Sequence, residues 1–310
     1  MMEENKEILH EALKRGSVEV LGENLPNYPL PFKLIKTDQF SLGEIEKRGI
    51  CLNVILLGLT GTGKSRLLEV IGNYGLGVDY WDPYRFQVKK DEHTEKITSY
   101  TFSTRYENRL PLPVTIIDTP GFLNATAEDD RKLMGDIRNF IHSNQMPIHA
   151  VAYVIPASQG RLTAEQKTVL WNMPKALGED EERIKRISYL FCTFADSKLL
   201  PVLESVKEAG LRYKTHFAVN SAAYFVDEKV LSIEENKENR EKSINELLWT
   251  MTTESVREFL EDIQCNWPFQ VNLPIKALKP QTGDTKEYMN TAPARAPTAG
   301  AKLSISIGKF

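Results

Sequence analysis

An apolar segment runs directly into a glycine-rich loop and then into a helical pattern. The segment "ICLNVILLG" covers residues 50–58, and "LTGTGKSRLLEVIG" follows at 59–72. A run that is apolar at successive positions is typical of a strand buried on both faces, as in parallel sheets covered by helices. Parallel strands need crossover connections, which are usually helices. This stretch therefore predicts an α/β fold.

The pattern of buried strand and helix continues along the chain. Strand-like runs are "VTIID" (114–118), "AVAYVI" (150–155), "ISYLFCTF" (187–194) and "THFAVN" (215–220), and helical patterns cover 64–72, about 128–142, 163–177, 200–209 and 244–263. We predict a doubly wound, mostly parallel sheet with helices on both faces. The polar, alternating segment "EKITSYTFSTRY" (95–106) predicts an exposed antiparallel strand.

We divide the chain into three regions. Residues 1–48 hold a helix and an extended arm, because the prolines of "ENLPNYPLPFKLIKTDQF" (23–40) exclude a regular helix. Residues 49–265 form the main domain. Residues 266–310 form a C-terminal extension whose Pro, Thr, Ala and Gly content predicts that it is largely disordered.

Charge and cysteine content indicate which partners and which cellular compartment to expect. A net charge of -3 and a pI near 6.1 argue against nucleic acid as a main partner, because binding to phosphate backbones needs a basic surface. Cys51, Cys192 and Cys265 lack metal-type spacing and are typical of thiols in a reducing compartment. We therefore expect a cytoplasmic protein; the amphipathic helix at 3–15 leaves membrane association open.

The loop "GLTGTGKS" fits the phosphate-binding motif G-x-x-x-x-G-K-[ST]. Backbone N–H groups at the start of the following helix would point at the phosphates. We expect Lys64 to neutralise β- and γ-phosphate oxygens and the Ser65 hydroxyl to bind Mg²⁺. The expected nucleotide contacts are Gly58, Thr60, Gly61, Thr62, Gly63, Lys64, Ser65 and Arg66.

A second motif, "PVTIIDTPGF" (113–122), predicts the metal and γ-phosphate partners. Asp118 ends a buried strand and would hold a Mg²⁺-bound water, and the Gly121 N–H would meet the γ-phosphate. Many ATP-using proteins also end this strand in Asp, whereas D-x-x-G is typical of GTP switches. GTP is favoured over ATP.

The strand "YLFCTFAD" (189–196) predicts the guanine site, because Asp196 could accept hydrogen bonds from both guanine N1–H and N2–H. Thr193 takes the place of the usual Asn of an N-K-x-D motif, and Phe194 that of Lys. Asp196 could instead be the N-cap of the next helix. After the following strand, Asn220 and Ser221 begin a segment whose backbone could reach guanine O6.

With these segments in order, residues 50–225 resemble the septin-like branch of P-loop GTPases, most closely the immunity-associated (GIMAP-type) proteins. The resemblance is carried by "LGLTGTGKS", "IIDTPGF", "HAVAYVIPASQGRLTAEQKTV" and "FCTFADSKLLPVLESVKEAG". It implies that Thr94 is the switch I threonine that binds Mg²⁺ and γ-phosphate, although Thr98 and Thr101 lie close by. Phe122 stands where Ras-type enzymes have a glutamine that orients water.

We expect a molecular switch that binds GTP and GDP with Mg²⁺ and hydrolyses GTP slowly, with Lys64, Thr94 and Gly121 in catalysis. The resemblance implies a homodimer formed through the G domains that stimulates hydrolysis. Two alternatives stay open: a scaffold that oligomerises with little turnover, and an ATP-binding protein if Asp196 only caps a helix.

Overall fold

The computed structural model describes residues 2–15, 17, 25–43, 50–89, 94–103, 109–124, 126–178, 180–226, 228–235 and 243–271. Residues Met1–Leu273 form one compact unit. Most of the predicted C-terminal extension, from residue 272 onward, lies outside the described residues. No helix in the described ranges combines the length and apolarity needed to cross a membrane.

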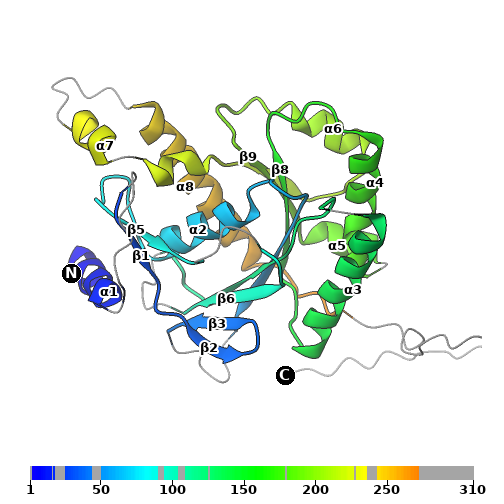
Figure 1. Cartoon of the computed structure of the whole chain (residues 1–310), viewed down its shortest axis with the longest axis horizontal. Coiled ribbons are helices and arrows are strands. Elements are labelled where there is room, and N and C mark those ends of the chain that lie inside the picture. The colour runs from blue at the N-terminus through cyan, green and yellow to red at the C-terminus, as the bar shows by residue number, and fades with distance from the viewer. Residues whose placement is uncertain are drawn as a thin grey trace, which may run out of the picture. The chain divides into compact units, whose positions relative to one another are not determined.

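Within those ranges, eight strands form one sheet in the order β10-β9-β8-β4-β7-β6-β3-β2 (Figure 1). The strands are β2 (Lys33–Lys36), β3 (Gln39–Leu42), β4 (Leu52–Leu57), β6 (Thr98–Phe102), β7 (Val114–Asp118), β8 (Ala150–Pro156), β9 (Ser188–Thr193) and β10 (Thr215–Ala218). The block from β10 to β7 is parallel, which confirms the predicted mostly parallel sheet.

Helices cover both faces of this sheet. The helices in the described residues are α1 (Met2–Arg15), α2 (Lys64–Gly75), α3 (Ala127–Ser143), α4 (Ala164–Asn172), η1 (Met173–Ala176), α5 (Glu181–Arg186), α6 (Val202–Glu208), η2 (Ser221–Phe225), α7 (Glu228–Glu235) and α8 (Ile244–Ile263). In Figure 1, α2 and α8 lie on one side of the sheet and α3 to α6 on the other. The doubly wound prediction is confirmed.

The central strand β4 shows why its sequence is apolar at successive positions. Val54 and Leu56 pack into the core shared with α2 and α8. Ile55 and Leu57 pack into the opposite core with α3, α4 and α6. Side chains alternate across a strand, so a strand covered on both faces must be apolar at odd and even positions alike.

The N-terminal arm contributes strands to two sheets. Its first strand, β1 (Asn27–Pro29), pairs with β5 (Arg85–Gln87) in a separate two-stranded sheet, and its strand β3 joins the main sheet by pairing in parallel with β6. The predicted antiparallel strand is present as β6, paired with β7. The prediction that this strand is exposed is wrong. Phe102 in β6 is only 1% exposed, because β3 pairs along the outer edge of β6 and the Phe32 ring packs against the Phe102 ring.

Helix α1 docks on the loop before β5 through a buried histidine. His10 Nε2 lies 2.6 Å from the Leu76 carbonyl oxygen, and His10 Nδ1 lies 2.6 Å from the Tyr84 hydroxyl. Since a carbonyl can only accept, Nε2 carries a proton. Burial lowers the pKa of His10 below its usual 6.5, which favours the neutral ring, and in that ring Nδ1 accepts from the Tyr84 hydroxyl.

We predict that this contact weakens in acid. The unfolded chain binds the His10 proton more tightly than the folded one, so the stabilisation is complete above about pH 6.5 and is lost as the pH falls below it. The melting temperatures of wild type and His10→Ala should differ at pH 7.5 and converge towards pH 5.5. A gap that stays constant over this range would contradict the assignment.

Candidate nucleotide-binding site

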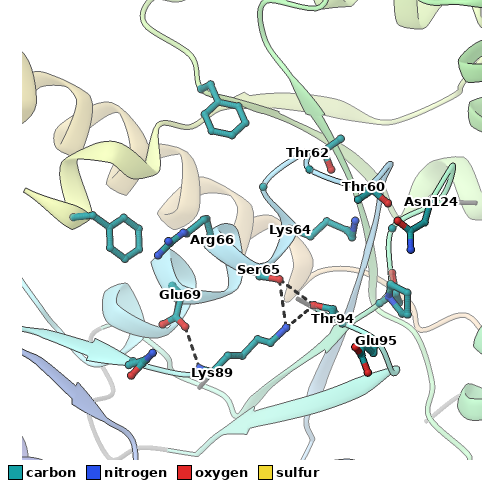
Figure 2. Close-up of a pocket in the computed structure, with 18 of the residues that line it drawn as sticks. Thr60, Thr62, Lys64, Ser65, Arg66, Glu69, Lys89, Thr94, Glu95 and Asn124 are labelled. Carbon is teal, nitrogen blue, oxygen red and sulfur yellow. Dashed lines mark hydrogen bonds between the residues drawn. The ribbon is translucent and has the colours of Figure 1, made fainter. Parts of the chain in front are cut away.

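A cleft of about 840 Å³ lies at the carboxyl ends of β4 and β7, where open α/β sheets bind ligands. The P-loop forms its floor. Residues from β1, β5, the segment at 94–95 and the segment at 119–124 line its walls. Figure 2 shows Thr60, Lys64, Ser65, Lys89 and Thr94 converging on this space. The cleft has the size of a small-molecule site.

The P-loop backbone adopts conformations that favour glycine. Gly61 and Gly63 have φ angles of 77° and 92°, in the left-handed region. Gly58 has little room for a side chain, because an added Cβ would lie 2.5 Å from the Val154 carbonyl oxygen. Helix α2 begins at Lys64, so its first N–H groups face the cleft.

Lys64 lies across the mouth of the loop. Its Nζ donates to the carbonyls of Gly58 at 3.1 Å and Leu59 at 3.0 Å, and the residue is only 6% exposed. Burial lowers the pKa of Lys64 to about 8, with nearby Asp118 partly opposing the shift. A phosphate would provide the anionic partner that two neutral carbonyls do not.

The three predicted metal ligands are brought together. The Asp118 Oδ2 accepts from Thr94 Oγ1 at 2.8 Å and from Ser65 Oγ at 3.4 Å, and the two hydroxyls lie 3.1 Å apart. Asp118 is fully buried, and its Oδ1 has no hydrogen-bond partner in the described part of the chain. Hydroxyl and carboxylate oxygens are what Mg²⁺ prefers, so this set fits the ion.

The structure shows which of the three candidate switch I threonines lies at the predicted metal site. Thr94 faces Asp118, whereas the Thr98 hydroxyl donates to the Lys96 carbonyl and the Thr101 hydroxyl is buried against Thr115. Of the three, Thr94 is the one placed at the metal site.

One residue at this site was missed by the sequence reasoning. Lys89 Nζ lies 2.8 Å from Asp118 Oδ2 and also donates to Thr94 Oγ1. No motif marks this lysine in the sequence. The only available signal is that it lies five residues before the switch I threonine.

The segment after Asp118 packs tightly on the P-loop. A Cβ on Gly121 would lie 2.4 Å from the Thr60 Cα, so glycine is needed for this approach. Phe122 forms an isolated β-bridge with Leu59 and is completely buried. Phe122 therefore closes the core beneath the cleft, and its side chain cannot orient a water molecule.

The predicted base motif lies beside the P-loop. The Thr193 hydroxyl donates to the Thr62 carbonyl at 2.7 Å, which joins β9 to the P-loop. Phe194 adopts a φ of 55° and lines the cleft, half exposed. Asp196 is exposed on the following loop. It does not cap α6, because the N-cap of that helix is Pro201.

Of the other predicted nucleotide contacts, some are held within the fold and some line the cleft. Asn220 is structural: its amide nitrogen donates to the Ala195 carbonyl and its oxygen accepts from the Ala222 N–H. Ser221 begins η2 next to it. Arg66 stacks over the Phe225 ring at 4.2 Å, and both line the cleft. Thr60 and Gly61 line the cleft directly, whereas the Thr62 hydroxyl is turned back to the Leu59 carbonyl.

Parts of the chain are similar to known proteins. Residues 52–191 match the model of the AIG1 family. Two solved structures of Toc33 from Arabidopsis thaliana are similar. The complex with GDP and Mg²⁺ has 16% identity, covers 72% of this chain and 88% of that chain, and has a TM-score of 0.46. The complex with Mg²⁺ and GMPPNP has 17% identity, coverage of 71% and 88%, and a TM-score of 0.44.

A more distant match is the signal recognition particle receptor SRb-GTP/SRX complex from Chaetomium thermophilum, with 19% identity, coverage of 55% and 90%, and a TM-score of 0.37. No match was found among curated proteins. The match to the family model includes the P-loop, Thr94, Asp118 and most of β9. Residues 52–191, which hold the P-loop, Thr94 and Asp118, therefore match the AIG1 family over a little less than half of the chain.

Proposed function

We propose that this G domain hydrolyses GTP slowly on its own and faster when two copies pair through their nucleotide faces. One observation carries the proposal. Ser65, Thr94 and Asp118 converge to hold Mg²⁺, yet the position that orients water in Ras-type enzymes holds the buried Phe122. Efficient hydrolysis then needs a group from elsewhere to orient the water or neutralise the transition state.

The test is turnover per molecule as a function of protein concentration, with light scattering in GTP and in GDP. Pairing predicts that the rate per molecule rises with concentration and levels off where the scattering reports a dimer. A rate that is independent of concentration would overturn the proposed pairing. GTP-dependent association with negligible turnover would instead support the scaffold alternative.

We also propose that Asp196 selects guanine. Its exposed carboxylate, its position after β9 and the Thr193 link to the P-loop support this role. With Pro201 as the N-cap of α6, the alternative that Asp196 caps this helix is wrong. The ATP-binding alternative depended on that cap.

Asp196→Ala should lower GDP affinity at least about tenfold while leaving ADP affinity unchanged, because guanine N–H groups lose their acceptor. Thermal unfolding with Mg²⁺ and each nucleotide measures this preference. Asp180→Ala is a matched control, because Asp180 does cap a helix, accepting from the Arg183 N–H at 3.0 Å. It should lower stability without changing nucleotide preference. An unaltered GDP preference in Asp196→Ala would contradict the role.

The compartment stays a proposal. In the described part of the chain Cys51, Cys192 and Cys265 are free thiols, which supports a reducing environment such as the cytoplasm.

A further inference from the structure

Lys89 lies at the centre of the metal-ligand set. Its Nζ is 2.8 Å from Asp118 Oδ2 and 3.4 Å from Ser65 Oγ, and it also donates to Thr94 Oγ1. Both members of the ion pair are buried: the side chain of Lys89 is 9% exposed and that of Asp118 is fully enclosed. Figure 2 shows the lysine extending beneath Ser65 towards Thr94.

This ammonium group contacts the same three side-chain oxygens that would hold Mg²⁺. An ammonium donates three hydrogen bonds and takes up oxygen ligands much as a small cation does. Asp118 Oδ2 accepts from all three neighbours, Lys89 among them. Two cations within a few ångströms of each other in a buried site repel strongly. Lys89 in this position and Mg²⁺ at Asp118 therefore exclude each other.

The backbone around Lys89 is held by α2, the helix that follows the P-loop. The Glu69 carboxylate accepts from the Val88 N–H at 2.8 Å and the Lys89 N–H at 3.0 Å. The next turn of α2 holds the same segment. The Asn73 side chain donates to the Phe86 carbonyl and accepts from the Phe86 N–H, each at 2.8 Å. The start of the segment is fixed to the P-loop helix, so movement of the Lys89 side chain alone can vacate the metal position.

We propose that Lys89 is an internal cation that competes with Mg²⁺ for Asp118, Thr94 and Ser65 and must leave Asp118 before Mg²⁺ binds there. The inference rests on the Mg²⁺-nucleotide site described above. A buried carboxylate without a partner is strongly destabilising, so the Lys89 contact stabilises Asp118 whenever Mg²⁺ is not bound to it. The same contact weakens apparent Mg²⁺ affinity, because only the fraction of molecules with Lys89 displaced can bind the ion.

The experiment compares Lys89→Met with Lys96→Met, an exposed lysine of the same switch region. Two quantities are measured on the full chain. The first is the melting temperature in EDTA without nucleotide. The second is the Mg²⁺ concentration that half-maximally slows release of a fluorescent GDP analogue. Lys89→Met should lower the melting temperature by several degrees and lower the half-maximal Mg²⁺ concentration about tenfold. Lys96→Met should change neither.

An unchanged or increased Mg²⁺ requirement in Lys89→Met would overturn the inference, because Lys89 would then not compete with the ion. If the methionine variant does not fold without nucleotide, Lys89→Gln keeps a hydrogen-bond donor for Asp118 while removing the charge, and the same fall in Mg²⁺ requirement is expected. The proposed pairing fails in a different assay, namely turnover that is independent of concentration, so the two failures are distinguishable.

Discussion

Lys64→Met should lose nearly all GDP binding while the nucleotide-free protein stays as stable as the wild type. Removing one member of a buried, hydrogen-bonded charge pair costs about 3–5 kcal/mol, so affinity should fall by roughly 10²- to 10⁴-fold. Without phosphate, Lys64 is a buried cation whose pKa burial lowers to about 8, so an apolar side chain of similar length should be tolerated.

Titration calorimetry with GDP and Mg²⁺ measures the first effect, and thermal unfolding without nucleotide measures the second. Lys167→Met is a suitable control, because Lys167 forms a surface ion pair with Glu208 at 2.9 Å. Its replacement should leave both quantities nearly unchanged. A Lys64→Met protein that melts far below the wild type without nucleotide would show that the lysine is a structural element of the loop.

The largest loss of stability is expected from Phe259→Ala in α8. Phe259 is fully buried, and its ring packs against Tyr189, Phe191 and Phe217 at centroid distances of 5.1, 4.9 and 5.9 Å. Truncating a buried phenylalanine costs about 3–5 kcal/mol, which corresponds to a fall of roughly 10 °C in melting temperature for a domain of this size.

Trp267→Ala provides the contrast for that measurement, because Trp267 is a large aromatic residue that is 88% exposed. Its replacement should change the free energy of unfolding by less than about 0.5 kcal/mol. Similar losses for the two variants would mean that α8 does not dock on β9 and β10 in solution as described.

The parallel core could be predicted because each of its strands carries its own signal. β4 is apolar at every position except Asn53, and β7 ends at Asp118, as the sequence predicted. The burial of β6 could not be predicted in the same way. It depends on β3, a short strand about sixty residues earlier in a proline-rich arm with no clear alternation.

The site shows the same division between local and long-range information. The P-loop and Asp118 follow from contiguous motifs, and the structure selects Thr94 from three nearby threonines. Lys89 could not be found from sequence, because its role depends on how Glu69 fixes the start of the switch segment. Asn220 was predicted to contact the nucleotide, but both ends of its amide bind backbone groups.

The hydrogen bond from the Thr193 hydroxyl to the Thr62 carbonyl joins the end of β9 directly to the P-loop. A ligand that holds the P-loop also fixes the position of the loop after β9, so the free energies of base and phosphate binding are coupled. Pyrophosphate in the P-loop should therefore raise the affinity of the site for unlinked guanosine, and guanosine should raise the affinity for pyrophosphate by the same factor.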